Sequence, residues 1–215
     1  MIPLTERLRR TDSVAVSDSV TLGDQGNLAA ALDAFKAMLA ITERLAKADP
    51  DNAGWQSDLS LSHNKIGEVL RAQGNLPAAL EGFRASLAIT ERLAKTDPSN
   101  VGWQSDLAVS HGSIGNVLRA QGNLPAALEG FRASLAIAEH LAKADPSNAD
   151  WQYKLALSHR DIATVLAHQG AKSEATAAFE QARAITVRLI QQSPDSATLP
   201  KDLAWFEAQL AELRK

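Results

Sequence analysis

The chain has 215 residues, of which 45% are hydrophobic and 22% are charged, and its formal net charge is −3. This composition suffices for one folded array and is too apolar for a disordered chain. The absence of cysteine excludes disulfides, thiolate metal sites and thiol catalysis. No stretch rich in Lys and Arg with interleaved aromatic residues occurs, so we expect no nucleic-acid partner.

The first 52 residues are predicted to form a degenerate repeat. Residues 1–25 match the later repeats poorly, and we expect a helix across part of 5–23. Residues 26–50 place apolar side chains at helical spacing and predict a complete helix. The start of the chain lacks the apolar core of a signal peptide, and no run reaches the roughly 18 apolar residues of a membrane span. We therefore expect a cytoplasmic protein that does not bind membranes.

A unit of 48 residues then recurs in near-copy along the chain. The copies open with Trp55, Trp103 and Trp151, and residues 55–102 and 103–150 are identical at 38 of 48 positions. A helix pair of this size cannot bury its own apolar face, so neighbouring copies must stack. The repeat therefore predicts an all-α fold, a right-handed solenoid of stacked antiparallel helix pairs.

Each copy is predicted to contain two helices joined by a Gly-Asn turn. In the first copy, Asn52 is a favourable N-cap for a helix that runs to about Gln73. Gly74 can adopt the left-handed conformation that ends this helix. The second helix is expected to run to about Thr96, where the following Pro98 stops it.

The repeat boundaries divide the chain, which is predicted to be one domain of residues 1–215. After a helix expected at about 173–192, the C-terminal segment carries Leu203, Phe206, Leu210 and Leu213 at helical spacing and predicts a lone capping helix over about 200–214. The predicted parts are a degenerate repeat at 1–52, repeats at 53–100, 101–148 and 149–196, and a capping helix in 197–215.

A short motif recurs in each copy, and in the first copy it reads His63-x2-Ile66-Gly67-x2-Leu70, then Ala79-x3-Phe83. This motif resembles the tetratricopeptide repeat, whose pattern is W-x2-L-G-x2-Y followed by A-x3-F. The spacing agrees, although the repeat here has 48 rather than 34 residues and a His replaces the first aromatic residue. The resemblance covers about residues 19–215. It implies a protein-interaction scaffold whose first helices line a concave face, similar to arrays in large bacterial signalling proteins.

Half of the ten differences between the two near-copies lie along one stripe of their first helix. Five of the differences fall at positions spaced 1, 3, 1 and 3, which share one face of a helix. We interpret this stripe as a binding groove whose chemistry changes between repeats. The alternative is a solvated face that is free to vary. The stripe contains Ser60/Ala108, Leu61/Val109, Asn64/Gly112, Lys65/Ser113 and Glu68/Asn116, with Ala156, Leu157, Arg160, Asp161 and Thr164 in the third copy.

Cations extend this stripe and indicate the kind of partner. Arg71 and Arg119 lie one turn further along, and Arg160 adds a third cation. Arg binds carboxylates through two parallel hydrogen bonds, so we expect a protein or peptide partner of acidic character. Trp205, in register with Leu157, is predicted to close the end of the groove. The predicted partner-binding residues are Leu61, Asn64, Lys65, Glu68, Arg71, Val109, Ser113, Asn116, Arg119, Leu157, Arg160, Asp161, Thr164 and Trp205.

We expect neither an enzyme nor a metal or cofactor site. His63, His111 and His159 recur with the repeat, but equivalent atoms of adjacent repeats should lie roughly 10 Å apart. A shared metal needs its ligands about 2 Å from the ion. These His residues are therefore interpreted as packing residues, as are the repeated Trp residues. No Gly-rich phosphate loop and no catalytic set of side chains occurs.

Two alternative functions remain open at this stage. One is self-assembly into a homo-oligomer through the N-terminal segment, which carries Leu4, Leu8, Val14, Val16 and Val20. The other is a regulatory arm of a larger bacterial signalling protein.

Overall fold

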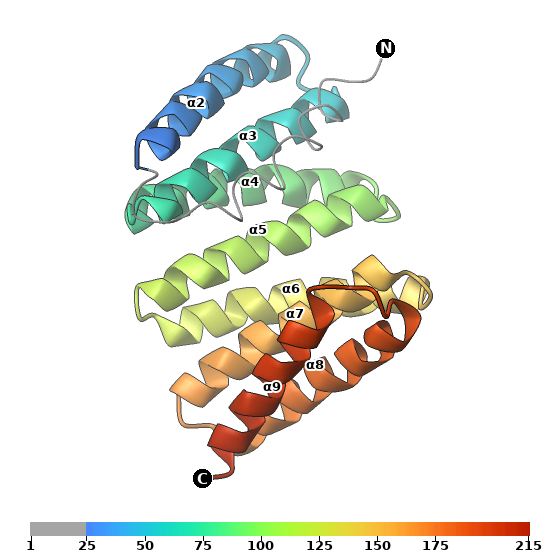
Figure 1. Ribbon diagram of the computed structural model, residues 1–215. Coiled ribbons are helices and arrows are strands. Elements are labelled where there is room, and N and C mark those ends of the chain that lie inside the picture. Colours follow the sequence, from blue (N-terminus) through green and yellow to red (C-terminus); the bar gives the residue numbers. More distant parts are fainter. Residues whose placement is uncertain (1–24) are drawn as a thin grey trace. The chain divides into compact units, whose positions relative to one another are not determined.

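A computed structural model describes residues 25–215, which form eight helices and no strand (Figure 1). The chain divides into two compact units, Met1–Asp97 and Pro98–Lys215. None of the described helices is long and apolar enough to cross a membrane. The helix predicted within 5–23 and the apolar residues proposed for self-assembly lie outside the described residues. The helices are α2 (Gln25–Ala48), α3 (Ala53–Ala72), α4 (Leu76–Thr96), α5 (Val101–Ala120), α6 (Leu124–Ala144), α7 (Ala149–His168), α8 (Lys172–Gln192) and α9 (Leu199–Leu213).

The first unit stacks α2, α3 and α4, and the predicted turn residues set the ends of these helices. The side chain of Asn52 accepts a hydrogen bond from the backbone N–H of Trp55 at 3.1 Å, which caps α3. Gly74 has a φ of +78°, a left-handed conformation that suits glycine and ends the helix. Asn75 then caps α4 by accepting from the N–H of Ala78 at 3.3 Å.

A glycine lets the two helices approach closely in the pairs α3–α4 and α5–α6. An added Cβ at Gly67 of α3 would lie 2.8 Å from the ring of Phe83 on α4, a side chain that is only 1% exposed. The second unit repeats this contact between Gly115 of α5 and Phe131 of α6, again at 2.8 Å. The missing side chain therefore makes room for the phenyl ring that fills the centre of the pair.

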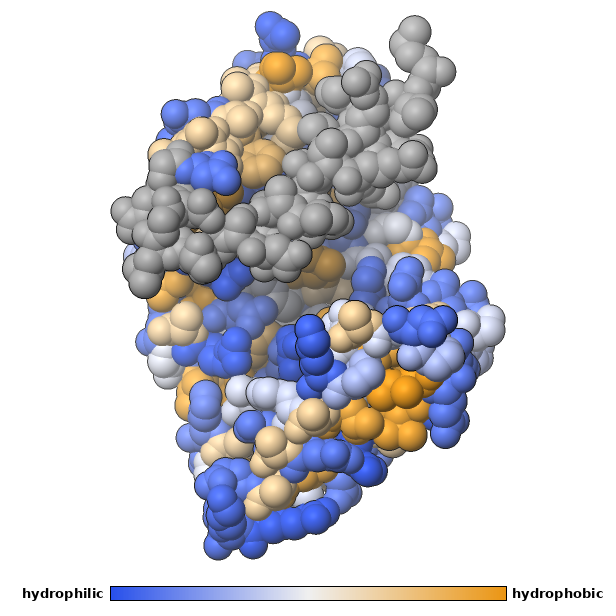
Figure 2. Space-filling model, viewed as in Figure 1, coloured by the Kyte–Doolittle hydropathy of each residue, from blue (hydrophilic) through white to orange (hydrophobic). Residues whose placement is uncertain are grey.

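The second unit stacks the pairs α5–α6 and α7–α8 and ends with α9 packed on α8. Phe206 and Leu210 of α9 are buried against Phe179 and Ala182 of α8. Figure 2 shows hydrophobic residues among hydrophilic ones on the side of this unit where α8 approaches α9. The predicted all-α fold of stacked antiparallel helix pairs is confirmed within each unit.

Candidate functional site

Residues of three helices in the second unit line an open hollow of about 310 Å³. Five of the predicted partner-binding residues line it: Val109, Ser113 and Asn116 on α5, and Leu157 and Asp161 on α7. The remaining lining residues are Ser105, Ala108 and Gly112 on α5, Ser134, Ala138 and Leu141 on α6, and Trp151, Lys154 and Ser158 on α7.

Small side chains at helical spacing create this hollow. Positions three and four residues apart share one face of a helix, and α5 places Ser105, Ala108 and Gly112 on the face that borders the hollow. Ser134 and Ala138 of α6 are also short. The larger Val109 keeps 44% of its surface exposed beside them. The hollow therefore combines an open apolar wall with small polar groups.

Lys154 provides a cation at one end of the hollow. Its ammonium group donates a hydrogen bond to Ser105 Oγ at 2.8 Å and lies 4.5 Å from the centroid of the Trp151 ring. Burial lowers the pKa of Lys154, while the negative charges of Asp106 and Asp150 oppose this shift. The amine is thus oriented by a neutral hydroxyl and by an aromatic face, which favours a cation.

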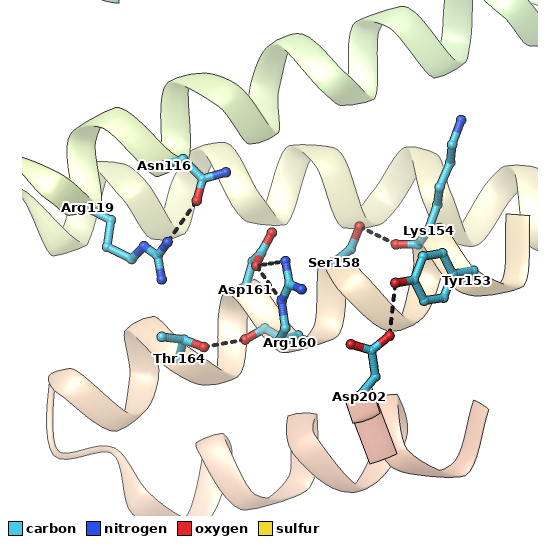
Figure 3. Close-up of polar contacts among 9 residues, drawn as sticks. All are labelled: Asn116, Arg119, Tyr153, Lys154, Ser158, Arg160, Asp161, Thr164 and Asp202. Carbon is cyan, nitrogen blue, oxygen red and sulfur yellow. Dashed lines mark hydrogen bonds and ion pairs between the residues drawn. The ribbon is translucent and has the colours of Figure 1, made fainter. Parts of the chain in front are cut away.

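Asp161 lies at the other end and is held by Arg160. Its Oδ1 accepts hydrogen bonds from Arg160 Nε at 3.0 Å and Nη2 at 2.9 Å (Figure 3). Burial raises the pKa of Asp161, and the positive charges of Arg160 and Arg119 oppose the rise. Arg119 donates to Asn116 Oδ1 at 3.0 Å. Two arginines thus accompany a single carboxylate between α5 and α7.

The other predicted residues of this unit lie outside the lining of the hollow. Thr164 donates its hydroxyl hydrogen to the backbone carbonyl of Arg160 at 2.8 Å, a bond within its own helix. Trp205 is 40% exposed and packs edge-to-face on Phe179, with ring centroids 5.7 Å apart. Its predicted role in closing the groove stays a prediction.

The stripe of the first unit has a different character. Asn64 is buried, with 7% of its surface exposed, and Leu61 is half-buried. Lys65 forms an ion pair with Glu68 at 3.1 Å. Arg71 is exposed in the last turn of α3. These residues therefore offer one exposed cation and one ion pair, and their part in partner binding stays a prediction.

Sequence reasoning missed the polar end of the hollow. Lys154, Ser105 and the α6 residues do not belong to the variable stripe, and Trp151 was interpreted as packing only. The signal that could have identified Lys154 is its register: the residue one repeat later is Asp202, so the sign of the charge reverses between copies.

The stacked pairs define an all-α helical-repeat protein, and the family comparison agrees with that class. A family model described as "Tetratricopeptide repeat" matches residues 19–51 and 62–99. Two segments of the chain therefore match the tetratricopeptide repeat, which confirms the resemblance that the Gly67, Ala79 and Phe83 spacing predicts. A search of curated protein sequences finds no match.

Solved structures of helical proteins resemble this chain at low sequence identity. BtubC (BKLC) from P. vanneervenii has a TM-score of 0.63 and 17% identity, over 86% of this chain and 65% of that chain. The apo form of RapI has a TM-score of 0.41 and 14% identity, over 86% and 60% of the two chains. The designed helical repeat protein DHR64 has a TM-score of 0.35 and 13% identity, over 88% and 95%. The chain thus spans less than two thirds of BtubC, and that likeness concerns the fold alone.

Proposed function

We propose that this protein is an interaction scaffold that binds a peptide segment of a partner on the face shared by α5 and α7. Tetratricopeptide repeats are generally protein-interaction scaffolds. The observation that carries the proposal is the hollow itself, because its lining contains the stripe along which the near-copies differ. Gly67 and Phe83 at the centre of the first pair recur as Gly115 and Phe131 in the second, whereas the residues of this face vary between those copies.

The size and chemistry of the face suit a short peptide. From Ser105 to Asn116 the lining of α5 extends over about 16 Å, at 1.5 Å per residue. An extended peptide of about five residues covers that length. Concave sites of about 300 Å³ or more with apolar walls and few polar groups are typical of ligand pockets. Exposed Val109 and half-buried Leu157 supply the apolar wall.

The charges favour an acidic partner, and we propose no enzymatic reaction. Arg160 and Arg119 flank Asp161, so this end of the face carries one more positive than negative charge. Two nitrogens of Arg160 donate hydrogen bonds to one oxygen, Oδ1, of the Asp161 carboxylate, which makes it a fixed structural group rather than an acid or base free to react.

Affinity capture with matched variants tests the proposal. The wild-type chain would be used as bait beside Val109→Glu/Leu157→Glu, which places two carboxylates in the apolar wall. Arg132→Glu on exposed α6 serves as the control for added negative charge. We expect a partner that is retained by the wild type and the control and is lost with the double variant. Equal retention by all three baits would contradict binding on this face.

A further inference from the structure

The hollow has an internal counterpart one repeat further along the second unit. The hydrogen bond between Lys154 Nζ and Ser105 Oγ, at 2.8 Å, joins α7 to α5. One 48-residue repeat later, Asp202 is the equivalent of Lys154 and Tyr153 is the equivalent of Ser105. The Tyr153 hydroxyl donates to Asp202 Oδ2 at 2.9 Å and joins α9 to α7 (Figure 3). The chain therefore contains two versions of one interhelical bond.

The two versions differ in the bulk of their side chains. Tyr153 places a phenol ring between α7 and α9, and burial raises the pKa of its hydroxyl to about 12. The equivalent residue at the hollow is Ser105, which has no ring. Likewise Ser158, which lines the hollow, corresponds to Phe206, a ring that is 1% exposed. The hollow is thus bordered by small residues where the following repeat supplies aromatic rings.

The sign of the charge reverses at the same place. Asp202 accepts the hydrogen bond of the tyrosine, whereas Lys154 can only donate. An aromatic group that enters the hollow with a polar end must therefore offer an acceptor to the lysine. A carboxylate satisfies this requirement and also complements the positive charge. Asp106 and Asp150 lie near Lys154, so the complement is one carboxylate rather than a run of them.

We propose that the hollow receives one aromatic side chain of the partner peptide, and that Lys154 binds a carboxylate next to that side chain. This inference rests on the proposed function and names the part of the partner that the face selects. Arg160 neutralises Asp161 at the far end, so the carboxylate already in the hollow does not repel an acidic peptide. The partner then supplies an aromatic ring and a carboxylate, which Tyr153 and Asp202 supply within this chain at the following repeat.

A set of three synthetic peptides tests the inference on the full chain. The probe is acetyl-Gly-Asp-Phe-Asp-Gly-amide, in which one Asp is next to the ring whichever way the peptide runs along the face. In the two matched peptides Ala replaces Phe or Asn replaces both Asp residues. Binding is followed by the backbone amide shifts in two-dimensional NMR. We expect the probe to shift the signals of Ser105, Val109 and Leu157. Loss of the ring or of both carboxylates should each weaken binding by about tenfold or more.

One double variant, here called the filled variant, copies the following repeat and closes the hollow. Ser105→Tyr combined with Lys154→Asp recreates the Tyr153–Asp202 pair, so the variant is expected to fold and to lose probe binding. The single variant Lys154→Gln lacks the cation, so it should bind the probe and the Asn-substituted peptide equally. The control Arg132→Gln should behave as the wild type.

Four outcomes would overturn the inference. They are an unbound probe, equal binding of the Phe and Ala peptides, unchanged binding to the filled variant, and a concentration-dependent mass that the filled variant abolishes. The last would assign the hollow to a second copy of this chain. The affinity capture tests the proposed function separately. If a partner binds the filled variant but not the Val109→Glu/Leu157→Glu variant, binding on this face is supported and only the aromatic site is contradicted.

Discussion

Helices α3 and α5 are near-copies that present different surfaces. Both have 20 residues, begin with an Asn cap on a Trp backbone N–H at 3.1 Å, and bring a glycine against a phenyl ring. In α3, Ser60 is 5% exposed and its hydroxyl bonds that of Ser86 on α4 at 2.9 Å. In α5 the equivalent residue is Ala108, and Ser134, the equivalent of Ser86, lines the hollow.

The comparison separates two kinds of position within the same repeat. Cap and core positions are determined by packing, because a change there disturbs the helix pair itself. At a stripe position, α5 has Ala108 where α3 has Ser60, and the two helices still have the same length and the same ends. A new surface can therefore arise on an unchanged framework.

The largest expected effect is at the ring in the centre of each pair. Phe83→Ala and Phe131→Ala should each reduce the free energy of unfolding by about 3–5 kcal/mol, because both side chains are 1% exposed and leave a cavity. Urea denaturation of the full chain measures both losses. A large loss for one variant and almost none for the other would show that the two pairs do not share a framework.

Overpacking the same contact should cost less. An added Cβ at Gly115 meets the Phe131 ring at 2.8 Å, so Gly115→Leu should destabilise by about 1–3 kcal/mol. The control is Gly112→Leu on the same helix, where an added Cβ has as its nearest neighbour Ser134 Oγ at 3.7 Å. Both variants gain the same side chain and are compared by melting temperature. An equal fall in melting temperature for both variants would mean that the glycine–phenyl contact does not cause the destabilisation by Gly115→Leu.

Exchanging the stripe residues themselves should have a smaller effect. Ser60→Ala gives α3 the residue of α5 and removes a buried hydroxyl pair, which should cost about 0.5–1.5 kcal/mol. The reverse change, Ala108→Ser, adds a hydroxyl near Ser134 and should leave stability almost unchanged. Urea denaturation midpoints of the two variants test this asymmetry. If Ala108→Ser costs as much as Ser60→Ala, the stripe is part of the framework.

Much of the fold follows from local signals in the sequence. The helix predicted from Asn52 to about Gln73 is α3, Ala53–Ala72, and the C-terminal helix expected over about 200–214 is α9, Leu199–Leu213. Asn caps, a glycine with positive φ and helical periodicity act within a few residues of the chain, so they are readable without knowledge of the packing.

The candidate site was predictable only in part. Val109 and Leu157 were found because the copies differ along their stripe. The Lys154–Ser105 bond joins residues 49 positions apart and depends on how α7 is offset along α5, which periodicity does not specify. Adjacent residues on a helix do not face one another, so the Arg160–Asp161 pair was also not expected. A long guanidinium side chain turns back to make that pair.

The smallest predicted effect is a pH dependence that the two units share. His63 of α3 and His159 of α7 occupy equivalent positions, and burial lowers the pKa of both imidazoles, while Glu43 and Glu139 respectively oppose the shift. The unfolded imidazole has a pKa of about 6.5. The unfolded chain therefore binds protons that the folded chain resists. This stabilising contribution is complete above about pH 6.5 and is lost as the pH falls through that value toward the folded pKa.

Removal of the two imidazoles should flatten this part of the stability profile. We expect the urea midpoint of the wild type to fall between about pH 7 and pH 5, and the fall to shrink in His63→Gln and His159→Gln and to shrink further when they are combined. His168→Gln, on an exposed side chain in the last turn of α7, is the matched control and should retain the full fall. A wild-type urea midpoint that rises on acidification would contradict the predicted loss of stability at low pH. A shallower profile in only one of the single variants would show that the first and third copies hold this His differently.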